Sequence, residues 1–200
     1  NNNMAAKGYL TESLLNDLIN ITQSDTRYIE KKCLHLKAHQ LTWRPTKDSW
    51  NILEILSHLN SYSDYYNKLF IKKIEKDKSK SPKKYFTSSP LGKSAWKSMK
   101  LGRAKNVKRK FRATKPYNPT LSPELITDDA YEKFIRYQNE MVSILEMAKK
   151  INLKKVKVPI SISKLIRLRM GDALMFVVYH TERHVQQIYN VINHSKFPKK

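Results

Sequence analysis

The sequence predicts an all-α fold, an antiparallel four-helix bundle with a long basic crossover between its second and third helices. Two observations lead to this class. Four long segments of the 200-residue chain repeat apolar residues at three- and four-residue intervals, which is the spacing of one helix face. A chain of this length with 40% hydrophobic residues is large enough for one core and short for two. We therefore expect residues 1–200 to form a single domain.

The first two predicted helices are separated by a proline. The first covers about Tyr9–Leu36 and is followed by Pro45, a residue that cannot continue a helix and keeps its predecessor out of the helical region. The second covers about Trp50–Glu75, and Asp48 or Ser49 is expected to cap its first turn. Both helices have one apolar side, so we expect them to line a shared core.

A strongly basic segment follows the second helix. Between Lys72 and Lys115 there are 17 Lys or Arg residues against 2 acids, which supplies most of the net charge of +22. Prolines and serines interrupt this stretch, so we expect residues 72–121 to form a basic, partly irregular connection with one short helix. Its charge favours nucleic acid or another polyanion as a partner, although no RNP, helix-turn-helix or zinc-finger signature accompanies it.

The third predicted helix covers residues 127–150, with Thr127 or Asp128 as its cap. Residues 156–162 then alternate apolar and polar side chains as a strand does, over too few residues to require a sheet. We interpret them as an extended linker. The fourth helix covers Gly171–Asn193.

Two histidines lie on the apolar side of this fourth helix. His180 and His184 share an arc with Val177 and Ile188, so their rings are expected to point inward. Buried imidazoles require hydrogen-bond partners or a metal ion, and the i, i+4 spacing lets two rings bind one ion. Spacing alone leaves both interpretations open. His58 lies at the edge of the second helix's apolar arc, where it faces either the interior or the rim.

Two segments carry a family resemblance. The first is Trp50–Asn60, which ends in His58-Leu-Asn and is preceded by Leu41-Thr-Trp-Arg-Pro45. The second is His180-Thr-Glu-Arg-His184, followed by Val-Gln-Gln187. Together they resemble the DinB-like superfamily of metal-dependent four-helix-bundle proteins, related to bacillithiol and mycothiol S-transferases. The resemblance implies a metal site formed by His58, His180 and His184, holding a divalent ion that in the family is typically nickel or zinc.

Other candidate residues compete with this set. His35 and His39 also have i, i+4 spacing and lie near Cys33, which makes a rival group of metal ligands. Glu54 and Gln187 are placed to orient ligands or to contact a bound water, and each is equally well interpreted as an ordinary polar helix residue. Cys33 is expected to be a small core residue, not a nucleophile.

Two function classes follow. The first, which the resemblance implies, is a metal-dependent enzyme, a thiol S-transferase or a hydrolase-like protein, that acts on a small molecule such as a low-molecular-weight thiol. The second is a non-catalytic protein that binds metal or a polyanion such as nucleic acid. One cysteine and the lack of a long apolar run predict a cytoplasmic protein with no membrane partner. Helix faces also permit a homodimer. With four glycines and no Walker or GxGxxG motif, nucleotide-phosphate chemistry is not expected.

Overall fold

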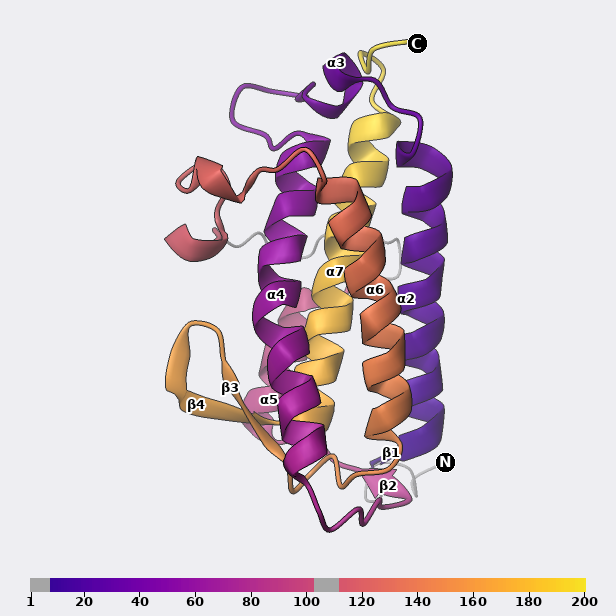
Figure 1. The fold of residues 1–200 in the computed structure, drawn as a ribbon, viewed down its shortest axis with the longest axis vertical. Coiled ribbons are helices and arrows are strands. Elements are labelled where there is room, and N and C mark those ends of the chain that lie inside the picture. Colours follow the sequence, from indigo (N-terminus) through magenta and orange to yellow (C-terminus); the bar gives the residue numbers. More distant parts are fainter. Residues whose placement is uncertain (1–7, 103–111) are drawn as a thin grey trace.

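Four long helices lie side by side in the computed structural model, which describes residues 8–102 and 112–200 (Figure 1). They are α2 (Thr11–Cys33), α4 (Ile52–Lys76), α6 (Ala130–Ala148) and α7 (Met170–Ile192). In Figure 1, α2 and α7 run upward and α4 and α6 run downward. Residues 77–129 therefore return along the molecule from the end of α4 to the start of α6. The described part of the chain is mainly helical with only small sheets, in agreement with the predicted all-α class.

Shorter elements connect and cover the long helices. They are α3 (Ala38–Leu41), α5 (Pro90–Met99), the 3-10 turns η1 (Lys115–Tyr117) and η2 (Pro123–Leu125), and strands β1 (Tyr9–Leu10), β2 (Tyr85–Phe86), β3 (Lys157–Ile160) and β4 (Ser163–Arg169). Strands β1 and β2 pair in one antiparallel sheet, and β3 and β4 pair in another. The predicted basic connection thus contains one short α-helix, α5, which packs on α7 through the buried Trp96 side chain. Residues 103–111 of that connection lie outside the described residues.

Three sequence predictions need correction. Residues 156–162 are not a linker, because Lys157–Ile160 form β3 and pair with β4. The sequence pattern does not reveal the partner strand β4. Leu165 and Ile166 are both exposed and lie beside Lys164 and Arg167, so apolar and polar residues do not alternate there.

The predicted helix caps are also wrong. Helix α4 is capped by Asn51, not by Asp48 or Ser49, and the N-cap of α6 is Asp129, not Thr127 or Asp128. The first helix begins at Thr11, since Tyr9 and Leu10 belong to β1, and it ends at Cys33. Several polar residues precede each helix here, and only the backbone geometry decides which of them is the cap.

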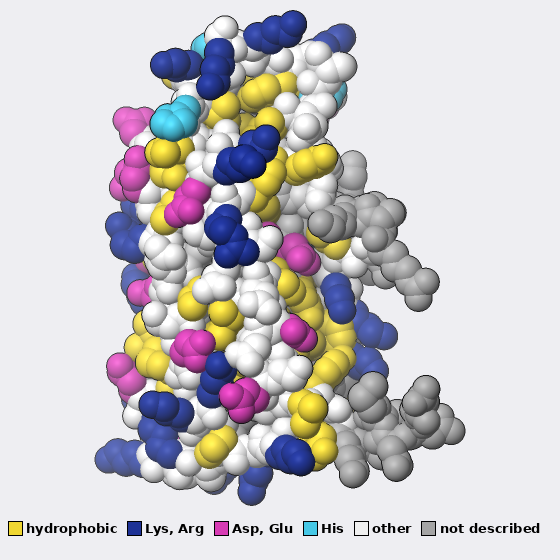
Figure 2. All heavy atoms as spheres, turned by 90° about the vertical axis from the view of Figure 1, so that its right-hand side faces the viewer, with side chains coloured by type: hydrophobic (Ala, Val, Ile, Leu, Met, Phe, Trp, Pro, Cys, Tyr) yellow, Lys and Arg dark blue, Asp and Glu magenta, His cyan; other side chains and the backbone are white. Residues whose placement is uncertain are grey.

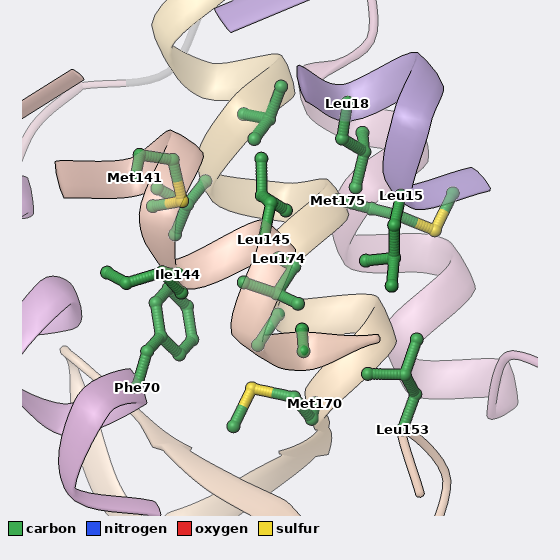
Figure 3. Close-up of a cluster of buried hydrophobic side chains, with 14 of the residues drawn as sticks. Leu15, Leu18, Phe70, Met141, Ile144, Leu145, Leu153, Met170, Leu174 and Met175 are labelled. Carbon is green, nitrogen blue, oxygen red and sulfur yellow. The ribbon is translucent and has the colours of Figure 1, made fainter. Parts of the chain in front are cut away.

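The apolar core has two parts. One cluster joins the lower halves of the long helices in Figure 1, with Leu15, Phe70, Leu145 and Leu174 among its fully buried members (Figure 3). The other, at the opposite end, includes Ile29, Ile55, Phe134 and Ile188. Buried polar residues lie between the two clusters on α2, α4 and α7: Thr22, Thr26, His58, Ser63, His180 and Thr181. We call these six residues the polar layer.

Candidate metal centre

Helices α4 and α7 bring His58 and His180 of the polar layer together with His184. His180 and His184 stand one turn apart on α7, and His58 reaches them from α4. A nitrogen from each ring lies within 4.8 Å of a nitrogen from both others. His58 and His180 are only 2% and 5% exposed, and His184 is half-buried. The open question for His58 is therefore resolved, because its ring faces the interior.

Two of the three rings have their Nδ1 atoms held by hydrogen-bond acceptors. His58 Nδ1 lies 2.5 Å from the Tyr117 carbonyl oxygen, and His184 Nδ1 lies 2.8 Å from Gln187 Oε1. A carbonyl oxygen only accepts, so each Nδ1 carries the proton. The Nε2 atoms of His58 and His184 are then left with free lone pairs. This is the arrangement by which proteins orient histidines that bind metal ions.

His180, the third histidine, has different hydrogen-bond contacts from the other two. Its Nε2 lies 3.1 Å from His58 Nε2, and its Nδ1 is buried with no hydrogen-bond partner among the described residues. Since His58 Nε2 carries a lone pair, one proton at most fits between the two nitrogens. An ion held between Nε2 atoms would replace this contact. The donor set, three nitrogens and no charged ligand, suits a divalent transition metal.

Burial keeps all three imidazoles neutral. Desolvation lowers the pKa of His58 to about 4, although its hydrogen bond to Tyr117 acts in the opposite direction. Desolvation and then the neighbouring His58 lower the pKa of His184 to about 3. For His180, desolvation, His184, His58 and Arg183 together hold the pKa well below the usual value. Because metal ions bind the neutral ring, these histidines are in the ligating form near neutral pH.

Aromatic side chains enclose the histidines. Tyr62 packs on His180 at a ring distance of 4.3 Å, and Phe176 stacks against the same ring at 6.1 Å. The Trp50 indole lies 5.0 Å from the His58 ring and 6.2 Å from the His184 ring. Such a wall excludes water and lowers the local dielectric constant, which accounts for the large desolvation effects on the pKa values.

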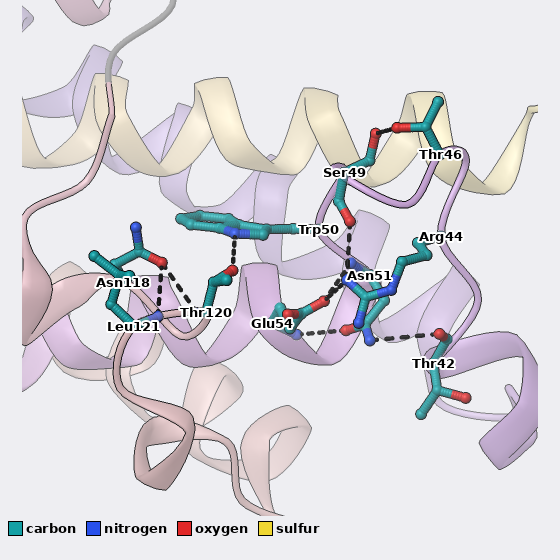
Figure 4. A network of polar contacts seen from close by, with 10 residues as sticks. All are labelled: Thr42, Arg44, Thr46, Ser49, Trp50, Asn51, Glu54, Asn118, Thr120 and Leu121. Atoms are coloured by element: carbon teal, nitrogen blue, oxygen red, sulfur yellow. Dashed lines mark hydrogen bonds and ion pairs between the residues drawn. The ribbon is translucent and has the colours of Figure 1, made fainter.

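A polar network at the start of α4 fixes Trp50 and the helix that carries His58 (Figure 4). Asn51 and Glu54 form a capping box, in which each side chain accepts from the other residue's backbone amide. Arg44 donates to Glu54 at 2.6 Å and also to the Ser49 carbonyl. Glu54 therefore stabilises the helix start, and its hydrogen bonds among the described residues go to Arg44 and Asn51 and not to a histidine, so it orients α4 as a whole.

The returning segment contributes to the site as well. Trp50 Nε1 donates to Thr120 Oγ1 at 3.0 Å, and the buried Asn118 side chain accepts from the Thr120 and Leu121 amides (Figure 4). This turn presents the Tyr117 carbonyl to His58, and the Tyr117 ring packs on Tyr62 at 4.6 Å. Sequence reasoning missed Tyr117, because a backbone acceptor carries no side-chain signature.

An open cavity of about 700 Å³ lies beside the histidines, between α4, α6 and the returning segment. Ser57, Ser61, Asp64, Tyr65 and Tyr117 are among its lining residues. The three histidines do not line it. Of its lining residues, Ser57 precedes His58 in the chain and Tyr117 accepts a hydrogen bond from the His58 ring. The cavity therefore flanks the histidine cluster and does not contain it.

The rival histidine set does not come together. Within the described residues, His35 and His39 join no group of three potential ligands, and His39 Nε2 instead lies 3.4 Å from the Lys199 carbonyl. Cys33 is a buried core residue, as expected, and burial raises the pKa of its thiol to about 12. Gln187, in contrast, has the orienting position that its sequence spacing suggested.

The family model of the DinB superfamily matches residues 33–188, which include all three histidines. The chain belongs to the DinB superfamily. This DinB-superfamily protein has no significant match among curated proteins or solved structures. No helix in the described part of the chain is long and apolar enough to cross a membrane.

Proposed function

We propose that this DinB-superfamily protein is a metal-dependent enzyme in which His58, His180 and His184 hold a divalent ion, nickel or zinc. The observation that carries the proposal is the convergence of three neutral imidazoles, two buried and one half-buried, of which two are oriented by acceptors on Nδ1. Structural zinc sites are usually closed by four ligands, whereas three protein ligands leave a position for water or substrate. Three histidine ligands therefore favour a catalytic metal site over a purely structural one.

Each surrounding residue has a definite task in this proposal. Tyr117 and Gln187 keep a proton on Nδ1 of His58 and His184, so that Nε2 of each ring faces the ion. Trp50, Tyr62 and Phe176 exclude bulk water from the rings. When bound, a divalent ion supplies Lewis acidity, which lowers the pKa of a water or thiol that coordinates it.

The substrate we propose is a small molecule, with a low-molecular-weight thiol as the sulfur donor. In an S-transfer the thiolate sulfur forms a bond to an electrophilic carbon, the leaving group departs with the bonding pair, and the thiol proton passes to solvent. In the hydrolase-like variant, water takes the place of the thiol. The cavity between α4 and the returning segment is the space we assign to the organic part of the substrate.

Elemental analysis of protein purified without an affinity histidine tag tests the site. We expect about one nickel or zinc per chain in the wild type and nearly none in His180→Ala, His184→Ala. The double variant His35→Ala, His39→Ala is the matched control, because it removes a pair with the same spacing outside the cluster. Equal metal loss in both double variants, or full metal content without His180 and His184, would reject the site.

Turnover separates the enzyme from a non-catalytic metal-binding protein. The metal-loaded protein is incubated with a thiol and an electrophile, and loss of free thiol is followed over time. Turnover that disappears in His58→Ala supports the enzyme. A full metal content with no turnover across thiols and ester substrates would favour the non-catalytic alternative.

A polyanion-binding role is the second candidate, and the charge of residues 72–115 favours it. Neutralising lysines of this segment should weaken binding to nucleic acid and leave the metal content unchanged, since all three histidines lie outside it. Binding that falls steeply with salt for every DNA sequence would indicate simple phosphate attraction.

We further propose that the four long helices form the four-helix bundle of a single domain that spans residues 1–200, with residues 72–121 as its crossover. A cytoplasmic location and a homodimer belong to the same proposal. Sedimentation velocity of the purified protein distinguishes a dimer from a monomer.

A further inference from the structure

The β3–β4 hairpin projects sideways from the long helices, at the lower left of Figure 1. Its turn end is fixed to α4 through residues 159–161. The Tyr65 hydroxyl donates to the Pro159 and Ile160 carbonyls at 3.2 Å, and the Ser161 amide donates to the Tyr66 hydroxyl at 3.0 Å. Helix α4 therefore holds the turn end of the hairpin in a defined orientation.

The tip carries aliphatic side chains that face solvent. Leu165 is 94% exposed, Ile162 is 66% exposed and Ile166 is 40% exposed. A leucine with this exposure contributes almost nothing to the core of its own chain. Three large aliphatic side chains exposed within residues 162–166, one in the turn and two on β4, mark a contact surface, because soluble proteins rarely expose such groups together.

The flanks of the same hairpin are exclusively basic. Residues 154–169 contain Lys154, Lys155, Lys157, Lys164, Arg167 and Arg169, with no Asp or Glu. None of the ion pairs between described residues involves these six. The face shown in Figure 2 differs, since acidic side chains there lie among the basic ones. The hairpin thus combines exposed aliphatic side chains with positive charge that no Asp or Glu of residues 154–169 offsets, although Asp172 lies near Lys157 at its base.

We propose that the β3–β4 hairpin docks on an anionic phospholipid surface. The aliphatic tip enters the headgroup and acyl boundary, and the lysines and arginines contact the acidic headgroups. This contact requires no membrane-spanning segment. It departs from the sequence-based expectation of no membrane partner, which rested on the lack of a long apolar run. Docking is independent of the histidine site and of the function proposed for it.

Charge and side-chain chemistry argue against two other occupants. Single-stranded nucleic acid is held by aromatic stacking beside positive charge, and residues 154–169 contain no aromatic residue. A second copy that paired along the β4 edge would bring two sets of six cations together, which like-charge repulsion disfavours.

Vesicle co-sedimentation of the full chain tests the proposal. We expect binding to phosphatidylcholine vesicles that contain roughly a third phosphatidylserine and little binding to pure phosphatidylcholine, with loss of binding as salt rises. The double variant Ile162→Ser, Leu165→Ser should weaken vesicle binding by about tenfold or more, because two aliphatic groups no longer enter the interface. Lys164→Gln, Arg167→Gln should weaken it through lost charge.

Leu34→Ser is the matched control, since Leu34 is also exposed but lies at the end of α2, far from the hairpin in sequence. It should bind vesicles as the wild type does. Unchanged thermal unfolding of each variant shows that the fold is intact, as expected for exposed positions.

Three results would overturn the proposal. The first is no binding of the wild type to anionic vesicles, and the second is unchanged vesicle binding of Ile162→Ser, Leu165→Ser. The third is a wild-type dimer or DNA complex that the serine variant loses, in the absence of vesicle binding.

Discussion

The two apolar clusters draw on all four long helices, whereas the polar layer between them comes from α2, α4 and α7, and the two kinds of region differ in what their side chains need. The clusters consist of apolar side chains such as Phe70 and Ile188, which need only packing contacts and no hydrogen-bond partner. In the layer, Thr22 and Thr26 donate to carbonyls of their own helix, whereas the buried His180 Nδ1 has no hydrogen-bond partner in the part of the chain that the structure describes. An unsatisfied buried group lowers stability, so the histidines occupy the core for a reason other than folding.

Removal of a ring from an apolar cluster should have the largest effect on stability. Phe70 is fully buried, so Phe70→Ala is expected to lower the free energy of unfolding by about 4 kcal/mol. Chemical denaturation measures the loss. Leu91→Ala is the control, because Leu91 is exposed and its removal should change stability by less than about 0.5 kcal/mol.

Lowering the pH should destabilise the protein through the polar layer and not through the apolar clusters. The pKa of His58 falls from 6.5 in the unfolded chain to about 4 in the folded protein, so the unfolded state binds more protons between these values. Stability is therefore full above about pH 6.5 and decreases as pH falls toward about 4, by about 3 kcal/mol for this residue. Denaturation of metal-free protein across this range measures it. A pH-independent stability, or the same slope in His58→Leu, would contradict the lowered pKa.

Gln187 tests whether orientation of a ring matters to the proposed site. Gln187→Ala removes the acceptor from His184 Nδ1 and should weaken metal binding by about tenfold. Gln186→Ala is the neighbour control, since Gln186 bonds Asn190 on the outside of α7. Gln187→Glu should restore affinity because a carboxylate also accepts. Calorimetric titration of metal-free protein provides the three affinities, and equal values for both alanine variants would exclude an orienting role.

The smallest expected effect is a change in stability on substitution of His180, a residue proposed to bind the metal ion. His180→Leu replaces a buried ring with an unpartnered nitrogen by an aliphatic group, so the metal-free variant should be about 1 kcal/mol more stable than the wild type. Its stability should no longer rise when nickel or zinc is added. A marked destabilisation of the metal-free protein would show that the polar layer supports folding after all.

The sequence predicted the fold class and the inward histidines because both depend on helical periodicity. His180 and His184 share the arc of Val177 and Ile188, and that arc is the buried side of α7. His58 lay at the edge of its arc, so sequence alone left its direction open. The structure decides it through packing of the Tyr62, Trp50 and His58 rings.

Features that depend on tertiary contacts could not be predicted from the local sequence. The Tyr117 acceptor reaches His58 only after residues 77–129 have returned along the molecule. The β3–β4 hairpin was hidden because the exposed Leu165 breaks the expected alternation. Asn51 was not distinguished from Asp48 and Ser49 as the cap, because all three residue types cap helices equally well.

The separation of the histidines along the chain bears on how the protein is synthesised. His58 precedes its acceptor Tyr117 by 59 residues and precedes His180 by 122 residues. During translation His58 therefore leaves the ribosome first, and the pair on α7 follows after α2, α4 and α6 are complete. If the three histidines bind one divalent ion as proposed, a nascent chain that stops before α7 has one of the three ligands and would hold the ion weakly. Tight binding of the ion would then identify molecules whose long helices have all been translated and folded.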